Sequence, residues 1–162
     1  MSEPLKVLQA PPSRSWQHAL SMGFIGLVLG LLVAGAVIFW KHRLVAPIYE
    51  AFLAVPTPIL QHRSEKGAWP ADFDLANPPE AVGAYGYGPV RGAVAKTGVP
   101  GAWRFQNRGA EGRPAVVFLP ASFDPETVRV LQSVDERLDD GDPASGRFRV
   151  DAGRASFTLK AD

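Results

Sequence analysis

The hydrophobic pattern separates one long apolar run near the start of the chain from a mixed segment behind it. From Met22 to Trp40 the sequence contains no charged residue. A helix of this length spans about 28 Å, close to the ~30 Å hydrocarbon core of a bilayer, and it satisfies its own backbone hydrogen bonds there. Trp16 and Trp40 stand near the two expected membrane interfaces. The pattern predicts a transmembrane helix over 22–40, preceded by a disordered leader over 1–21.

Two other interpretations of the apolar run stay open, a helix buried in a soluble core and a cleaved secretory signal. A domain of this size has little capacity to bury a helix that is apolar on every side. The run is long for a signal core, and no small-x-small cleavage site follows it at once. The sequence therefore favours a membrane anchor, but basic residues flank the run on both sides and leave its orientation open.

Small residues recur along the predicted span at Gly26, Gly30 and Ala34. Because they are spaced by four, they share one face of a helix, and such a face allows two helix backbones to approach closely. The stripe is a candidate helix–helix interface for self-association or for a partner. The alternative is that glycine is simply frequent in membrane helices.

Behind the span, the apolar spacing predicts that the helix continues over 43–63 as an amphipathic helix. The residues with near-helical spacing are Leu44, Ile48, Phe52 and Val55. Pro47 predicts a kink, and Pro56 with Pro58 predicts a break or a restart. Gly67 should end the helix.

Alternating apolar and polar residues predict short strands in the C-terminal half. These strands form two antiparallel hairpins, and their ranges are 103–106 with 115–119 and 147–150 with 156–160. The glycine- and proline-rich stretch 77–101 is predicted to be an irregular loop.

A helix is predicted between the hairpins, beginning at Asp124 with Pro125 in its first turn and ending at Gly141. Its apolar stripe consists of Val128, Leu131, Val134 and Leu138. The fold class is α+β, in which the transmembrane helix continues into an amphipathic helix packed on a small antiparallel sheet. The predicted core contains Trp103, Phe105, Val117, Leu119, Leu131, Phe148, Val150, Phe157 and Leu159.

Composition narrows the range of functions. Of the 162 residues, those at 41–162 are enough for one small soluble domain. The absence of cysteine excludes disulfides, thiol catalysis and cysteine-ligated zinc or iron–sulfur centres. The net charge of +1 is dispersed, so we expect no nucleic-acid partner.

No motif in the sequence predicts catalysis or a cofactor. His18 and His42 flank the predicted membrane helix, and His62 is expected on the exposed face of the helix behind it. None of the three has local partners suited to a triad or a metal site. Gly86-Tyr87-Gly88 lacks the spacing and the strand–helix context of a phosphate loop. We therefore expect a non-catalytic protein.

One acidic cluster remains, at Asp135, Asp139, Asp140 and Asp142. Several carboxylates around a glycine turn suit a hard cation such as Ca²⁺. The alternative is a solvated helix end, in which Arg137, Arg147 or Arg149 compensates carboxylates that oppose the helix dipole. The sequence favours the second interpretation. Asp139 and Asp140 are then expected to fold the corner between the helix and the hairpin and to bind no metal tightly, so no metal site is predicted and the four aspartates are weak candidates.

Three stretches resemble the type IV pilin and pseudopilin superfamily. The apolar helix, with Gly23-Phe24 near its start, runs into an amphipathic helix, as in the family. The segment Gly67-Ala68-Trp69-Pro70 is similar to the glycine–aromatic–proline turn that often closes the long pilin helix. The stretch from Val134 to Arg147, VDERLDDGDPASGR, is similar to an I-D-x-K-x-D-D-G-x-P-x-x-G pattern of some bacterial pilin-like proteins.

The chain departs from the family pattern where pilins carry a glutamate, because Val28 stands at that position. The charged residues that usually precede the cleavage glycine are also missing before Gly23. We therefore expect the leader to be retained and the protein not to polymerise as an ordinary pilin.

The resemblance implies an accessory or minor subunit of a type II secretion or type IV pilus-type machine. It places the chain in the bacterial inner membrane with the leader in the cytoplasm and 41–162 in the periplasm, in contact with lipid and with other pilin-like or secretion-machine proteins involved in protein transport. A membrane-tethered binding or scaffold module of an envelope complex is the second hypothesis, and a membrane-anchored hydrolase is the third.

Overall fold

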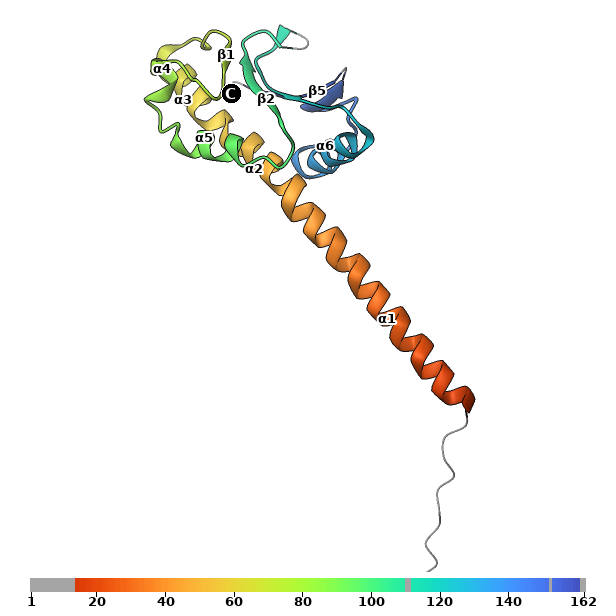
Figure 1. The fold of residues 1–162 in the computed structure, drawn as a ribbon. Coiled ribbons are helices and arrows are strands. Elements are labelled where there is room, and N and C mark those ends of the chain that lie inside the picture. The colour runs from red at the N-terminus through yellow and green to blue at the C-terminus, as the bar shows by residue number, and fades with distance from the viewer. Residues whose placement is uncertain (1–13, 110–111, 152, 161–162) are drawn as a thin grey trace, which may run out of the picture. The chain divides into compact units, whose positions relative to one another are not determined.

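The computed structural model describes residues 14–109, 112–151 and 153–160 and divides into two compact units, Met1–Phe39 and Trp40–Asp162. The second unit begins at Trp40, and the predicted domain begins at residue 41. The long first helix, α1, covers Arg14–Trp40 (Figure 1). The prediction of a disordered leader through residue 21 is therefore wrong for 14–21, which are helical; residues 1–13 lie outside the described residues.

Helix α1 does not bury its apolar side chains within the chain. Every residue from Leu20 to Phe39 is exposed. The described chain thus contains one helix that is long and apolar enough to cross a membrane, and it lies near the N-terminus. A signal sequence meets the same criterion of length and composition, whereas a helix buried in a soluble core does not leave its apolar surface exposed.

The helical segment behind α1 changes its hydrogen-bond pattern just before Pro47. A π-helical turn, η1, covers Lys41–Val45, and the N–H of Ala46 donates to the carbonyl of Lys41. Since Pro47 has no N–H for the carbonyl of Arg43, the wider turn accommodates its ring, as π-bulges do elsewhere.

Helices α2, Ala46–Ala54, and α3, Pro56–Lys66, follow η1. Val55 between them keeps helical dihedrals, so Pro56 restarts the helix at a position where its missing N–H costs little. Gly67 then adopts φ 71°, and its N–H donates to the Arg63 carbonyl at 2.8 Å. This left-handed cap confirms the predicted end of the helix.

The strands form one antiparallel five-stranded sheet in the order β1-β2-β3-β5-β4. Their bounds are β1 Phe73–Asp74, β2 Gly101–Gln106, β3 Ala115–Pro120, β4 Phe148–Asp151 and β5 Arg154–Thr158. Both predicted hairpins, β2–β3 and β4–β5, are confirmed, and so is the α+β class. The two-residue strand β1 was not predicted, because a pair of residues carries no detectable alternation.

The stretch 77–101 is not wholly irregular, and that prediction is partly wrong. It contains the short helices α4, Glu80–Gly83, and α5, Gly88–Ala95. Each buries one valine, Val82 in α4 and Val90 in α5. Pro89 lies in the first turn of α5, where proline is compatible with a helix start.

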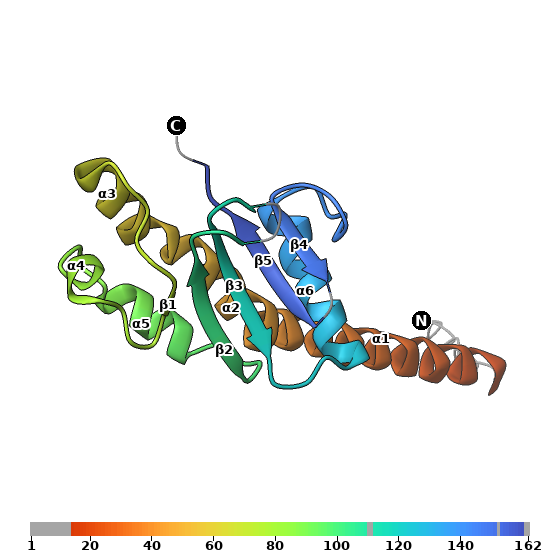
Figure 2. The same ribbon diagram turned by 90° about the horizontal axis from the view of Figure 1, so that it is seen from above.

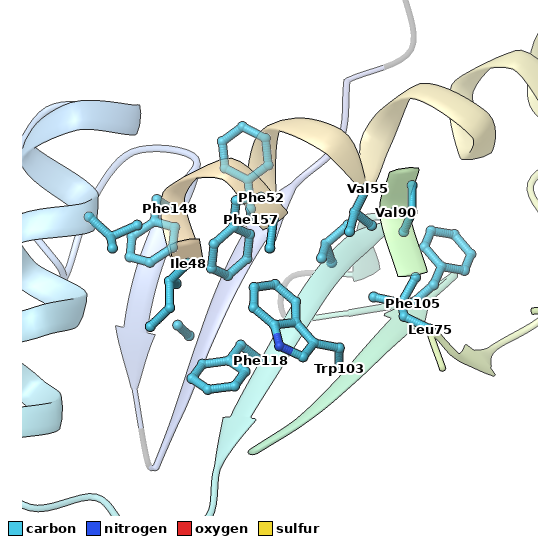
Figure 3. Close-up of a cluster of buried hydrophobic side chains, with 14 of the residues drawn as sticks. Ile48, Phe52, Val55, Leu75, Val90, Trp103, Phe105, Phe118, Phe148 and Phe157 are labelled. Atoms are coloured by element: carbon cyan, nitrogen blue, oxygen red, sulfur yellow. The ribbon is translucent and has the colours of Figure 1, made fainter. Parts of the chain in front are cut away.

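Helices α2 and α6, Pro125–Leu138, cover the same face of the sheet (Figure 2). Phe52 of α2 lies at the centre of the core, with ring centroids 4.7 Å from Trp103 and 5.0 Å from Phe148 (Figure 3). Of the predicted core, Leu119 and Val150 are only half-buried, and the other residues are buried. The sheet and α2 therefore share one apolar core.

Candidate functional site

The start of α6 has the predicted cap. The Asp124 carboxylate accepts a hydrogen bond from the N–H of Thr127 at 2.8 Å, and Pro125 occupies the first turn. This hydrogen bond lowers the pKa of Asp124 below its usual value. The helix is thus held at a fixed start, and its register determines which side chains meet the core.

The buried face of α6 differs from the predicted stripe. Leu131 and Val134 are buried as predicted, but Val128 and Leu138 are only half-buried. The face is completed instead by Thr127, Val130 and Asp135. The helix turns these residues to the sheet because α6 packs against both α2 and β4, and an acidic side chain is carried into the interior as a result.

Helix α6 ends earlier than predicted. The cap is Asp139, with φ −145°, whose N–H donates to the Asp135 carbonyl at 2.9 Å. Gly141, the predicted cap, lies in the following loop with φ 79°. The last turn therefore projects Asp139 and Asp140 into the corner that leads to β4.

The carboxylates of that corner organise the loop backbone. Asp139 accepts hydrogen bonds from the N–H groups of Arg147 and Phe148, and Gly146 before them has φ 69°. A β-carbon at Gly146 would collide with the Asp139 carboxylate, so the corner requires glycine there.

Asp140 holds the other side of the loop. Its carboxylate accepts from the N–H of Asp142 at 3.0 Å and from the Ser145 hydroxyl at 2.8 Å. These hydrogen bonds lower the pKa of Asp140. The prediction that Asp139 and Asp140 fold the corner between helix and hairpin is therefore confirmed.

Asp135 is placed differently from the other three acids. Its side chain has no exposed surface, and neither carboxylate oxygen has a hydrogen-bond partner among the described residues. One oxygen of each of Asp135, Asp139 and Asp140 lies within 4.8 Å of the others. Burial, followed by the charges of Asp140 and Asp139, raises the pKa of Asp135 to about 6.

Of the arginines expected to compensate these carboxylates, Arg149 helps to lower the pKa of Asp140 through its charge. The guanidinium of Arg147 stacks 4.6 Å above the Phe157 ring, and its Nε donates to the Thr158 carbonyl at 3.3 Å. The Nε of Arg149 donates to the Gly146 carbonyl at 3.3 Å. Neither of these hydrogen bonds reaches Asp135.

The histidines are separated, and one was predicted wrongly. His18 and His42 are exposed, but His62, expected on an exposed face, is buried. Its ring packs edge-on against Tyr85, with centroids 6.1 Å apart, and Tyr85 donates to Glu65 at 2.8 Å. This hydrogen bond raises the pKa of Tyr85. The contacts fasten the end of α3 to the turn that follows α4.

The small-residue stripe lies along α1. Gly26, Gly30 and Ala34 are all exposed within the chain. A β-carbon at either glycine would meet nothing within 4 Å. The face is therefore free of contacts from the described part of the same chain, and what it contacts in a membrane stays a prediction.

Among the described residues of the unit Trp40–Asp162, two hollows have volumes of about 250 Å³ and about 200 Å³. Both are smaller than the ~300–1,000 Å³ usual for pockets that bury a small molecule. The first lies along β1 and β2, and the second lies where Leu44, Val99 and the start of α6 meet. His62 lines neither hollow, so neither combines an imidazole with a cleft.

Comparisons of the chain with protein families, with curated proteins and with solved structures find no match. The resemblance to pilins is thus carried by the quoted residues and by the architecture alone. An exposed apolar helix that leads into a helix packed on an antiparallel sheet is compatible with that superfamily.

Proposed function

We propose that the protein is a non-catalytic, single-pass membrane protein that serves as a pilin-like accessory or minor subunit of a secretion or type IV pilus-type machine. The observation that carries the proposal is the exposed apolar helix α1, followed along the chain by a helix whose inner face forms the core of an antiparallel sheet domain. This is the architecture that the resemblance implies.

The outer face of the second helix supports a role in assembly. Leu53 is 51% exposed and Leu60 is 37% exposed. Because seven residues are about two helical turns, both side chains lie on one face, about 100° around the helix from the buried Phe52 and Ile59. In a subunit of a membrane machine, apolar side chains outside the core can pack against neighbouring subunits.

The proposed location is the bacterial inner membrane, with the domain behind α1 in the periplasm. A reporter that is active only outside the cytoplasm, fused after residue 162, should give signal, and a cytoplasm-specific reporter at the same site should not. The reverse result would contradict the orientation and, with it, the assignment to a pilin-type machine.

Photo-crosslinking from two positions tests the machine itself. A crosslinking residue at Leu53, on the outer helix face, should capture pilin-like or secretion-machine membrane proteins. The same residue at Arg104, which is exposed on β2, serves as the matched control and should capture far less. If the two positions label equally, the helix face is not the contact and the proposal loses its support.

The same experiment separates the alternatives. A stoichiometric partner unrelated to such machines would favour the second hypothesis, a membrane-tethered binding or scaffold module. An anchored hydrolase would instead show turnover that is lost on changing one polar side chain. The small size of both hollows favours a non-catalytic role over this third hypothesis.

A further inference from the structure

We propose that the hollow between η1 and the start of α6 binds the headgroup of a phospholipid that carries a primary amine, with the ammonium held by Asp124 and Glu126. The inference rests on the membrane anchoring of α1 that is part of the proposed function, and it goes further because it names a lipid class. It is supported by the place of the hollow along the chain, by its lining and by the order of charges around it.

The hollow lies close to the end of the apolar run along the chain. One of its walls is Leu44 of η1, which follows Trp40 by four residues in the same compact unit. Four residues of helix rise by at most about 6 Å. The headgroup layer on each side of a bilayer is roughly 5–8 Å thick. With Trp40 at the interface, Leu44 therefore lies at the level of the headgroups.

Close backbone contacts hold the walls of the hollow together. A β-carbon at Gly98 would collide with the Arg43 carbonyl, so glycine allows this loop to lie directly against η1. The N–H of Ala121 donates to the Pro100 carbonyl at 2.8 Å, which ties the exit of β3 to the same loop. The volume of about 200 Å³ suits a small group. An ethanolamine arm has only four non-hydrogen atoms, and a water molecule takes about 30 Å³ of liquid volume.

The lining combines apolar side chains with two carboxylates. The apolar part comes from Leu44, Val99 and Val130. Asp124 and Glu126 are exposed at the other side. The Asp124 carboxylate accepts from the N–H of Thr127 and from the Ser122 hydroxyl, and neither donor carries a charge, so a negative charge remains at the hollow. A primary ammonium has three N–H donors and can form charge-assisted hydrogen bonds with both carboxylates.

The order of chemical groups along this end of the domain matches a zwitterionic phospholipid. Such a lipid presents acyl chains, then a phosphate, then an ammonium. The chain presents the apolar run, then the exposed Lys41 and Arg43, whose positive charges suit the phosphate, and then the carboxylates of the hollow. Phe123, next to Asp124, is 42% exposed, and such an aromatic side chain suits the boundary between headgroups and acyl chains.

The test measures which lipid the full chain retains. Dioctanoyl phosphatidylethanolamine or dioctanoyl phosphatidylcholine is added to the chain in detergent micelles, and native mass spectrometry counts the lipids bound per chain. The two lipids have the same net charge, but the trimethylammonium of phosphatidylcholine has no N–H donor. We expect phosphatidylethanolamine to bind about threefold to tenfold more tightly, since two exposed ion pairs are at stake.

Two variants and one control assign the preference to the hollow. Asp124→Asn removes the charge and keeps a good N-cap, and Glu126→Gln removes the second charge. Each should lower the preference for phosphatidylethanolamine by about twofold, and the double variant should abolish it. Glu136→Gln changes an exposed residue of α6 that does not line the hollow, and it should keep the preference. Far-ultraviolet circular dichroism establishes folding; if Asp124→Asn does not fold, Glu126→Gln carries the comparison.

Equal retention of the two lipids by the parent chain would overturn the inference. So would a preference that the folded charge variants keep, or one that Glu136→Gln lowers as much as they do. Flotation with liposomes separates this inference from the proposed function. A chain that floats but shows no headgroup preference overturns the lipid site alone, whereas a chain that does not float contradicts the membrane anchoring as well.

Discussion

Replacing Phe52 by alanine tests the central packing of the fold. The Phe52 side chain has no exposed surface, and besides Trp103 and Phe148 its ring meets Phe157 at a centroid distance of 6.3 Å. Burying a phenylalanine contributes about 1.5–3 kcal/mol by transfer from water, and the cavity left behind adds to the loss. Phe52→Ala should therefore lower the free energy of unfolding by about 3–5 kcal/mol.

Leu53→Ala is the matched control, since Leu53 is the next residue in the same helix and is 51% exposed. It removes a similar apolar group from the outer face and should cost less than about 1 kcal/mol. For a domain of this size the difference corresponds to a melting temperature lower by roughly 10–20 °C in Phe52→Ala.

The measurement is thermal unfolding of the full chain in detergent, followed by near-ultraviolet circular dichroism. The near-ultraviolet signal comes from packed aromatic rings such as Trp103, whereas α1 contributes to the far-ultraviolet signal and stays helical in detergent. A loss in Leu53→Ala equal to or larger than that in Phe52→Ala would refute the assignment of the inner and outer faces of α2. The proposed contact face at Leu53 would fall with it.

Four further predictions concern the corner and the anchor. Stability should fall as the pH rises from about 4 to about 6, because the folded state holds the Asp135 proton more tightly than the unfolded chain; urea unfolding of Asp135→Asn should lack this slope. Gly146→Ala should lower the free energy of unfolding by at least about 1 kcal/mol more than Gly153→Ala, since both glycines have positive φ but only the first has a neighbour that a β-carbon would strike. Gly30→Ile should weaken association in a membrane two-hybrid assay, whereas Gly35→Ile, on a different face of α1, should not, and equal effects would argue against the stripe. Intact-mass spectrometry should find the leader retained, and a chain beginning at Phe24 would disprove this.

The elements with strong local signals were predictable from the sequence. The apolar run has no charge over its whole length, the strands alternate, and Asp124-Pro125 marks a helix start, so each needs only its own neighbours to be recognised. Gly67 is a similar case, because a left-handed cap favours glycine through backbone sterics alone. Helices α4 and α5 were missed because their glycines and prolines are typical of loops, and burial of Val82 and Val90 outweighs that preference.

The start of α1 and the burial of His62 depend on information that local patterns do not carry. Residues 14–21 are mixed in polarity, so their helical state follows from propagation of the neighbouring apolar helix and not from a periodicity of their own. His62 is buried because α4 returns to cover the end of α3, a contact between segments joined by an irregular connection. Neither the start of α1 nor the burial of His62 could be predicted from the spacing of apolar residues.

The acidic corner of the candidate site was predictable from the sequence, whereas the burial of Asp135 was not predicted. The motif from Asp139 to Gly146 indicated a tight acidic corner, and the backbone hydrogen bonds to Asp139 explain why glycine is needed where a β-carbon would strike that carboxylate. Asp135 follows Val128 by seven residues, about two helical turns, so it shares a face of α6 with the predicted apolar stripe. Its charge favoured a solvated position, and the packing of α6 against α2 and β4 shows that it is buried instead.

The spacing of the motif brings Asp135 close to the carboxylates of the corner. Residues four apart lie on one side of a helix, so Asp135 stands directly above Asp139 at the last turn, and Asp140 adds a carboxylate from the loop that follows. If Asp135 served only to end the helix in water, a position with no exposed surface would be the wrong place for it. An apolar residue there would extend the core at no electrostatic cost. Burial and the neighbouring carboxylates raise the pKa of Asp135 to about 6, so a proton neutralises this side chain below that pH, and urea unfolding between pH 4 and pH 6 tests this.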